Sequence, residues 1–536
     1  MKTTKKIILT GVACCFYVNG LFAGGLLTNT NQSVHFLRNP ARGASTEIDA
    51  VYTNPAGLAK LQTDGFHLSV NNQSAFQTRT ITSTSPYFAD YGGSETKTFK
   101  GEATAPVIPS LMAAYKKGKW VVSGYAGVIG GGGKLTFDKG LPSFETPISM
   151  IPGQLSVNGV TTTQYALNAF FEGSSYLFAG QLGGTFAFNE MFSIYAGVRI
   201  NFASNGYTGY LKNISINPIH PALNPTGQMM LANTFFNNAA QATQAAFISL
   251  QPAIDGGAGD FTLAQMVAAE QMTQAQVDQL AGGLGLSPQT AGAMTVKQTY
   301  DTFYSATGTY LYSAIQTADK NVDCSQSGMG ITPILGLNFN RDRLNIGVKY
   351  EFLTRMDIKN DTKVDNTGMF EDGVKTPNDI PALLTAGVSY YIVPDVKISA
   401  GYHHFFDSDA KMANDKQKFI DGGINEYQLG AEWQINKMFL ISAGGQITRT
   451  GVRDFYQSDM SFSLNSYSVG FGGAVNVSES VRINVGYLFT NYADWKPGTS
   501  DAILLPGTET GKGIGAIRNV FSRTNKALGI GVDLRF

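Results

Sequence analysis

Apolar and polar residues alternate along many short stretches of the chain, and this period of two limits the possible folds most. At the C-terminal end, KALGIGVDLRF places Leu528, Ile530, Val532, Leu534 and Phe536 on one side of a strand and Gly529, Gly531, Asp533 and Arg535 on the other. Successive residues of a strand point to opposite faces. RLNIGVKYEF and NEYQLGAEWQIN alternate in the same way and gather their charges on one face. The pattern predicts strands with one apolar and one polar face.

This alternation predicts fourteen strands and sorts the segments between them. The strands are 66–80, 102–115, 119–129, 174–189, 191–215, 326–340, 343–358, 381–392, 395–406, 425–436, 438–449, 463–477, 479–492 and 524–536. Six short turns alternate with seven long connections: 81–101, 130–173, 216–325, 359–380, 407–424, 450–462 and 493–523. An even strand number, with short turns at one end and long loops at the other, is typical of outer-membrane barrels.

The composition agrees with that fold class. Only 15% of the 536 residues are charged, while Gly, Phe and Tyr number 61, 34 and 24. After residue 23 no run of 18 apolar residues occurs, as a membrane-spanning helix requires. We therefore expect an all-β, 14-stranded antiparallel transmembrane barrel in contact with the lipid of a bacterial outer membrane. The terminal Phe536 resembles the C-terminal signature of such barrels, which implies recognition by the barrel-assembly machinery.

The first 23 residues have the layout of a secretory signal. A basic start, MKTTKK, precedes an apolar run and the small-residue exit NGLFA, which predicts cleavage after Ala23. A lipoprotein signal at Cys14 is the alternative, but Gly11 stands where leucine usually precedes such a cysteine. Cleavage removes three lysines and no acid, so the formally neutral chain becomes about −3. That charge does not favour a nucleic-acid partner. Cys324 alone remains, so no disulfide within the mature chain is expected.

The segment before the first strand carries a family resemblance. GGLLTNTNQSVHFLRNPARGASTEIDAVYTNPAGLAKL resembles the mature start of the long-chain fatty acid outer-membrane transporters, the FadL-type hydrophobic-compound channels. Asn54-Pro55-Ala56 matches the Asn-Pro-Ala motif of that family. The fourteen strands and the helix-bearing long loop agree with its architecture.

The resemblance implies a division of the chain and a mechanism. Residues 24–64 would fold inside the lumen as a plug, or hatch, and 65–536 would form the barrel. Fatty acids or other lipophiles would bind an outer apolar groove, pass to a site near the plug and leave through an opening in the wall, without a cofactor. Asn54 would satisfy neighbouring backbone amides within this buried turn, and Pro55 has no N–H to bury.

Glycines mark the third predicted strand, which in this family carries the wall opening. WVVSGYAGVIGGGGK contains Gly124, Gly127 and the run 130–133. Glycine weakens a strand and marks bulges or bends. The glycines are therefore candidates for a wall kink, although 130–133 are also interpreted as the start of the following loop, beyond the strand.

The longest connection, 216–325, predicts a helix of its own. Thr273 is a suitable N-cap for a helix from Gln274 towards Gly282, with Val277, Leu280 and Ala281 on one face. These three residues are candidates for an outer apolar surface that captures cargo. A packed cap on the barrel is the alternative.

Two other classes of protein are alternatives to the transporter. A Ser-His hydrolase in a barrel is disfavoured, because no motif gathers Ser, His and an acid, and we expect no enzyme activity. A porin for small polar solutes remains the alternative, although open porins usually lack an N-terminal plug. His403 and His404 are adjacent on a strand, face opposite sides and are poor co-ligands for a metal.

Overall fold

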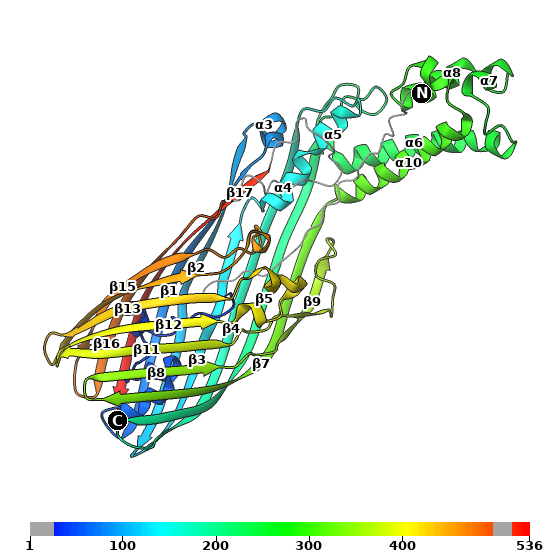
Figure 1. The fold of residues 1–536 in the computed structure, drawn as a ribbon. Helices are drawn as coiled ribbons and strands as arrows, with labels where there is room; N and C mark the ends of the chain where they lie inside the picture. Colours follow the sequence, from blue (N-terminus) through cyan, green and yellow to red (C-terminus); the bar gives the residue numbers. More distant parts are fainter. Residues whose placement is uncertain (1–25, 497–516) are drawn as a thin grey trace.

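A computed structural model describes residues 26–496 and 517–536. The predicted signal, 1–23, and the new N-terminus at Gly24 lie outside these residues. Of the 17 strands in the described chain, fourteen form one closed antiparallel barrel (Figure 1). They are β1 (Gly65–Thr84), β2 (Thr96–Lys117), β3 (Trp120–Phe137), β4 (Tyr165–Ala187), β5 (Phe192–Ile216), β7 (Lys320–Arg341), β8 (Leu344–Glu351), β11 (Leu383–Val393), β12 (Val396–Phe405), β13 (Ile424–Gln434), β14 (Phe439–Arg449), β15 (Ser466–Asn476), β16 (Val481–Tyr492) and β17 (Arg518–Arg535).

The first and last strands close the barrel. β1 pairs with β17 from His67↔Arg535 to Thr84↔Arg518. Phe66 and Phe536 exchange backbone hydrogen bonds of 3.2 and 2.9 Å. Closure leaves no open sheet edge, as a membrane-spanning sheet requires. The predicted fourteen-stranded antiparallel barrel is therefore confirmed.

The two faces of the wall differ as the alternation predicts. Outward-facing side chains include Leu528 and Ile530 of β17, which are exposed, whereas Asp533 of the same strand is buried. Arg199 of β5 and Lys349 of β8 are also buried on the inner face. A charge facing lipid at mid-bilayer costs about 2–4 kcal/mol, so placing charges inside favours this register of the strands.

The N-terminal segment, residues 26–64, lies against the inner wall. It contains α1 (Val34–Arg38), α2 (Ala50–Thr53) and the 3₁₀ helix η1 (Pro55–Lys60). α1 contacts β14 to β17 and β1, whereas η1 contacts β3, β4, β5 and β7. The segment therefore reaches parts of the wall that are distant from each other in the strand order.

Helices and the three remaining strands occupy the connections at the end opposite the C-terminus (Figure 1). They are α3 (Pro86–Gly92), α4 (Pro142–Ser149), α5 (Ile151–Val157), β9 (Asp357–Asp365), β10 (Lys375–Pro377), η2 (Asp407–Asp409), η3 (Ala413–Phe419) and η4 (Asp454–Tyr456). Between β5 and β7, the connection contains β6 (Met230–Leu231), α6 (Ala232–Asp255), α7 (Leu263–Ala268), α8 (Gln274–Gly283), α9 (Pro288–Gly292) and α10 (Val296–Gln316). In residues 26–496 and 517–536, no helix is long and apolar enough to cross a bilayer.

α8 begins where its sequence predicts. Thr273 caps it, and Thr273 and Gln276 form a reciprocal capping box. Val277, Leu280 and Ala281 are, however, only 1%, 7% and 1% exposed. The first two pack in a cluster with Leu263 and Phe303. These residues therefore form the core of the helical insertion, and the expectation that they present an outer apolar surface is corrected.

Candidate functional site: the lumen and the gap in its wall

Hydrogen bonds to three strands hold the Asn54-Pro55-Ala56 turn. The side-chain amide of Asn54 donates to the carbonyl oxygen of Leu337 on β7 at 3.1 Å. Thr185 of β4 donates to the carbonyl of Pro55 at 2.8 Å, and Ser193 of β5 donates to that of Ala56 at 2.7 Å. Asn54 therefore binds the barrel wall with its side chain, rather than neighbouring amides as its sequence context suggested.

Two wall glycines make room for Asn54. A side chain at Gly336 would place its Cβ 2.8 Å from Asn54 Oδ1, and one at Gly347 would place it 2.5 Å from Nδ2. Any larger residue at either position would displace the amide. The close fit identifies β7 and β8 as the part of the wall that receives the Asn54 side chain.

A buried cluster of charged groups joins the N-terminal segment to β12 and β13. Arg38 Nη1 lies 2.6 Å from Glu432 Oε1 of β13, and Arg42 Nη1 lies 3.2 Å from the same oxygen. Arg42 also pairs with Asp49 at 2.7 Å, and Lys397 of β12 pairs with Glu432. A buried ion pair is strongly destabilised when one partner is removed, so the cluster fixes where the segment docks.

A second charged group lies beside Tyr52. Arg199 of β5 binds both carboxylate oxygens of Glu351 on β8, at 2.5 and 2.9 Å. Lys349 binds Glu351 at 2.6 Å and the carbonyl oxygen of Tyr52 at 2.8 Å. The guanidinium of Arg199 lies 4.7 Å from the centre of the Tyr52 ring. Inward charges were visible in the strand alternation, but their partners were not.

His35, Glu47 and Asp49 form the closest arrangement to a metal site among the described residues. Their potential ligand atoms all lie within 4.8 Å of one another. Both carboxylates already bind Arg42, at 2.7 Å in each case. His35 Nε2 lies 3.1 Å from Asp533. The acids therefore serve as partners of arginine, and the arrangement fits an ion-pair cluster better than a cation site.

β2 and β3 separate over part of their length. Their pairing runs from Lys117↔Trp120 to Ser110↔Gly127 and resumes only at Glu102↔Thr136. Pro106 and Pro109 of β2 lie in the unpaired stretch and have no N–H to donate. The barrel wall therefore contains a local gap in its hydrogen-bond ladder.

The candidate glycines of β3 have different positions relative to this gap. Gly124 lies in the regular ladder opposite Ala113, whereas Gly127 is the last paired residue and Gly130 is unpaired with β2. β3 continues to Phe137, so the interpretation of 130–133 as residues beyond the strand is wrong. Gly131 has φ +97° and Gly133 φ +70°, which are values that favour glycine.

The N-terminal segment takes the hydrogen-bonding position that β2 leaves free on β3. Asn29 N donates to Ile129 O at 2.7 Å, and Gly131 N donates to Leu27 O at 3.3 Å. Thr28 and Gly130 form an antiparallel bridge between these bonds. A Cβ at Gly130 would lie 2.0 Å from Leu27 O, so this approach requires glycine.

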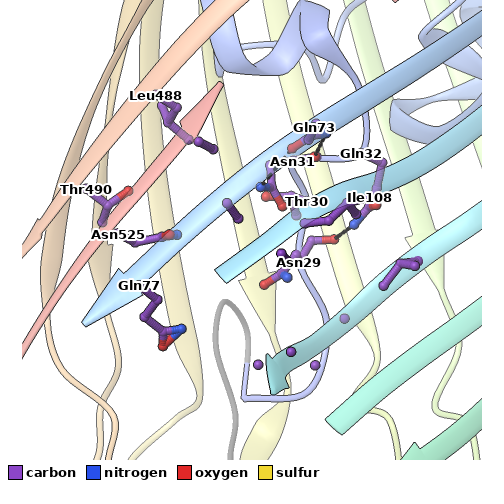
Figure 2. A pocket seen from close by; sticks show the side chains of 18 of the residues that line it. Asn29, Thr30, Asn31, Gln32, Gln73, Gln77, Ile108, Leu488, Thr490 and Asn525 are labelled. Atoms are coloured by element: carbon purple, nitrogen blue, oxygen red, sulfur yellow. Dashed lines mark hydrogen bonds between the residues drawn. The ribbon is translucent and has the colours of Figure 1, made fainter. Parts of the chain in front are cut away.

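A cavity of about 760 Å³ lies between the N-terminal segment and the gap (Figure 2). Its lining includes Val107, Phe178 and Phe202, which are 69%, 44% and 48% exposed and lie on the outer face of the wall. The lining also includes Asn31 and Gln32 on the inner side. Because one cavity has both inner and outer residues in its lining, it extends into the gap in the wall.

Burial moves the pKa values of two groups in the loops to about 7. Burial raises the pKa of Asp407, in η2, to about 7. Its Oδ2 accepts from Ile424 N at 3.1 Å. Burial lowers the pKa of Lys416, in η3, to about 7, and its ammonium lies 4.2 Å from the centre of the Tyr456 ring.

No protein-family model and no curated protein matches the sequence. Among solved structures, a FadL homologue of Pseudomonas aeruginosa is similar with a TM-score of 0.55 and 11% identity, over 96% of this chain and 100% of that chain. A deletion mutant of TodX, a monoaromatic hydrocarbon channel, has a TM-score of 0.50 and 14% identity over 94% and 99% of the two chains. The toluene transporter TodX of P. putida has a TM-score of 0.49 and 14% identity, over 92% of this chain and 95% of that chain.

Closure and the apolar outer face define the molecule as an outer-membrane β-barrel, since a spanning sheet must satisfy its backbone and present apolar side chains to lipid. The fold is that of the FadL-type hydrophobic-compound channels. At 11–14% identity the likeness concerns the fold alone.

Proposed function

We propose that this barrel is a non-enzymatic outer-membrane channel for the diffusive uptake of hydrophobic and amphipathic compounds. Cargo enters from the loop end, occupies the cavity and leaves sideways between β2 and β3 into the bilayer. The observation that carries the proposal is the continuity of the cavity with the gap, whose outer lining includes Val107, Phe178 and Phe202. The neighbours in fold include a monoaromatic hydrocarbon channel and a FadL homologue, which supports the same class of function.

In this proposal the N-terminal segment is the plug. Its ion pairs with Glu432 and its bonds from Thr185 and Ser193 hold it across the lumen. Gly127 and Gly130 belong to the wall opening, and Gly124 lies in the regular ladder next to it. The plug blocks a straight water path, so apolar cargo leaves through the wall.

A porin for small polar solutes is the second candidate, because part of the cavity wall is polar. Gln73, Gln77 and Asn525 all line it. Planar-bilayer conductance separates the two functions. A porin gives steady ionic conductance, whereas the proposed channel takes up lipophiles with little ion flow.

Obstructing the gap tests the proposal. Gly132 lines the cavity, and a Cβ there would have Arg79 Nη2 as its nearest neighbour at 3.8 Å, so a larger residue is accommodated. We expect Gly132→Phe to fold and to slow uptake of radiolabelled oleate by cells about tenfold or more. Gly184→Phe is the matched control, since its Cβ would meet only Val121 O at 4.0 Å and it does not line the cavity. Undiminished uptake by folded Gly132→Phe would exclude this exit route.

A further inference from the structure

The cavity wall contains a row of uncharged polar side chains on five adjacent strands. Strand register places Gln446 opposite Ser468, Ser468 opposite Thr490, Thr490 opposite Asn525 and Asn525 opposite Gln77. All five line the cavity. Figure 2 shows Thr490, Asn525 and Gln77 together on neighbouring strands. We call this row the polar ladder.

Part of the polar ladder is available to a ligand. Ser468 and Thr490 bond to each other at 2.8 Å, and Gln77 Oε1 accepts from Arg79 at 3.1 Å. The side-chain amide of Asn525, and Nε2 of Gln77, make no hydrogen bond to another residue of the described chain. These groups provide two NH₂ donor groups and one carbonyl acceptor side by side at the cavity surface.

The ladder ends at the gap, where the lining becomes apolar. The next residue across from Gln77 is Ala103 of β2. From there most of the lining residues of β2 to β5 are small or apolar, including Ala103, Ala105, Val107, Ile108, Phe178 and Phe202, and Thr104 and Tyr176 are the polar ones. The cavity thus has a polar inner side and an apolar side that reaches the outer face of the wall.

The charges at the cavity surface are few and already engaged. Glu426 and Arg523 are the charged residues in its described lining. Glu426 lies 2.8 Å from His403 Nδ1 and accepts from Gln446 at 2.9 Å. Arg523 lies 4.7 Å from the centre of the Tyr492 ring. An ionised head group would lose its hydration here and would find these charges already satisfied, which is unfavourable.

From this arrangement we propose a cargo class: single-chain amphiphiles whose head groups are uncharged and carry hydroxyl, ester or amide groups. The head binds the polar ladder at Asn525 and Gln77, and the tail lies along β2 and β3 in the gap. A hydrocarbon has no head group that could form hydrogen bonds with the polar ladder. A carboxylate loses its hydration when it enters the cavity, which weakens its binding. This inference rests on the proposed function and specifies its substrate.

Three probes with the same lauryl chain test it: 1-monolauroylglycerol, laurate and dodecane. Equilibrium binding of each radiolabelled probe to the full barrel in lipid nanodiscs is measured at mildly alkaline pH, where laurate is ionised, with empty nanodiscs subtracted. We expect the monoacylglycerol to bind about tenfold tighter than either other probe, since one or two hydrogen bonds distinguish them.

Variants assign that preference to the ladder. Gln77→Leu with Asn525→Leu is expected to remove the tenfold preference while binding of dodecane is kept. Asn491→Leu is the matched control, because Asn491 is next to Thr490 but does not line the cavity and instead bonds Tyr467 Oη at 2.8 Å. Heat-modifiable gel mobility verifies that each variant folds.

The outcomes separate this inference from the proposed function. Equal or tighter binding of laurate or dodecane overturns the cargo class and leaves hydrophobic uptake intact. An equal loss for all three probes in the folded double variant also overturns it, because the ladder would then serve the fold alone. Binding of none of the probes to the unmodified barrel overturns the cargo class and the proposed function together.

Discussion

Replacing Glu432 with alanine removes the acidic centre of the cluster that docks the N-terminal segment. Arg38, Arg42 and Lys397 all pair with this carboxylate. Arg38 is fully buried, and Glu432 and Arg42 are nearly so. The substitution therefore leaves buried cations short of a partner without changing the backbone ladder of the barrel.

The size of the effect follows from that burial. Removing one partner of a buried ion pair costs about 3–5 kcal/mol, because the remaining charge stays desolvated. Arg42 keeps Asp49 and Glu47, which places the effect near the lower end of that range. A change of about 3 kcal/mol lowers the ratio of docked to undocked segment by roughly 10²-fold. The fourteen strands keep their pairing, so this cost falls on the segment.

Planar-bilayer conductance and limited proteolysis measure that docking. We expect Glu432→Ala to assemble, to show brief openings to ions and to expose residues 26–64 to protease. Glu479→Ala, in an exposed turn between β15 and β16, is the control and should behave as the unmodified protein. Unchanged conductance and unchanged protection in folded Glu432→Ala would refute the view that these ion pairs hold the segment.

Three further predictions concern the turn, the loops and the insertion. Asn54→Ala loses the 3.1 Å bond to Leu337 O, and we expect about 1–3 kcal/mol weaker docking of the turn, seen as faster hydrogen exchange at 54–60 with the strands unaffected. In the folded protein the pKa of Asp407 is about 7, which is above its value in the unfolded chain. The protonated Asp407 carboxyl therefore contributes its full stabilisation of the fold at pH values below the unfolded pKa, and this contribution is lost as the pH rises through 7. Between pH of about 4 and 7, hydrogen exchange at 405–424, corrected for its intrinsic pH dependence, should therefore accelerate, and Asp407→Asn should remove the trend. Leu280→Ala should destabilise the helical insertion by about 2–5 kcal/mol. Far-UV circular dichroism on heating should then show the insertion melting earlier than the barrel. Uptake that falls while the insertion stays folded would restore a direct role for this helix face in cargo capture.

Local patterns were enough to predict the strands and the α8 helix. The alternation around Ile530 and Val348 reflects a wall with lipid on one side and the lumen on the other. Each strand shows this apolar and polar alternation within its own sequence. Thr273 and Gln276 form the cap of α8 within four residues, so their interaction is also readable from sequence. The apolar face of Val277 and Leu280 was readable too, but whether it met solvent or other helices depended on α7 and α10.

The site was decided by contacts between residues far apart in the chain. Arg38 and Glu432 are 394 positions apart, and Asn54 and Leu337 are 283 apart, so neither pairing leaves a local signal. The polar ladder likewise depends on strand register, which aligns Gln446, Thr490, Asn525 and Gln77 only after the barrel closes. Sequence determined which face of each strand turns inward, because lipid and water select that face residue by residue. Only the closed structure decided which inward residues meet, because closure fixes the register of β1 against β17 and brings the N-terminal segment against strands that are far apart in the chain.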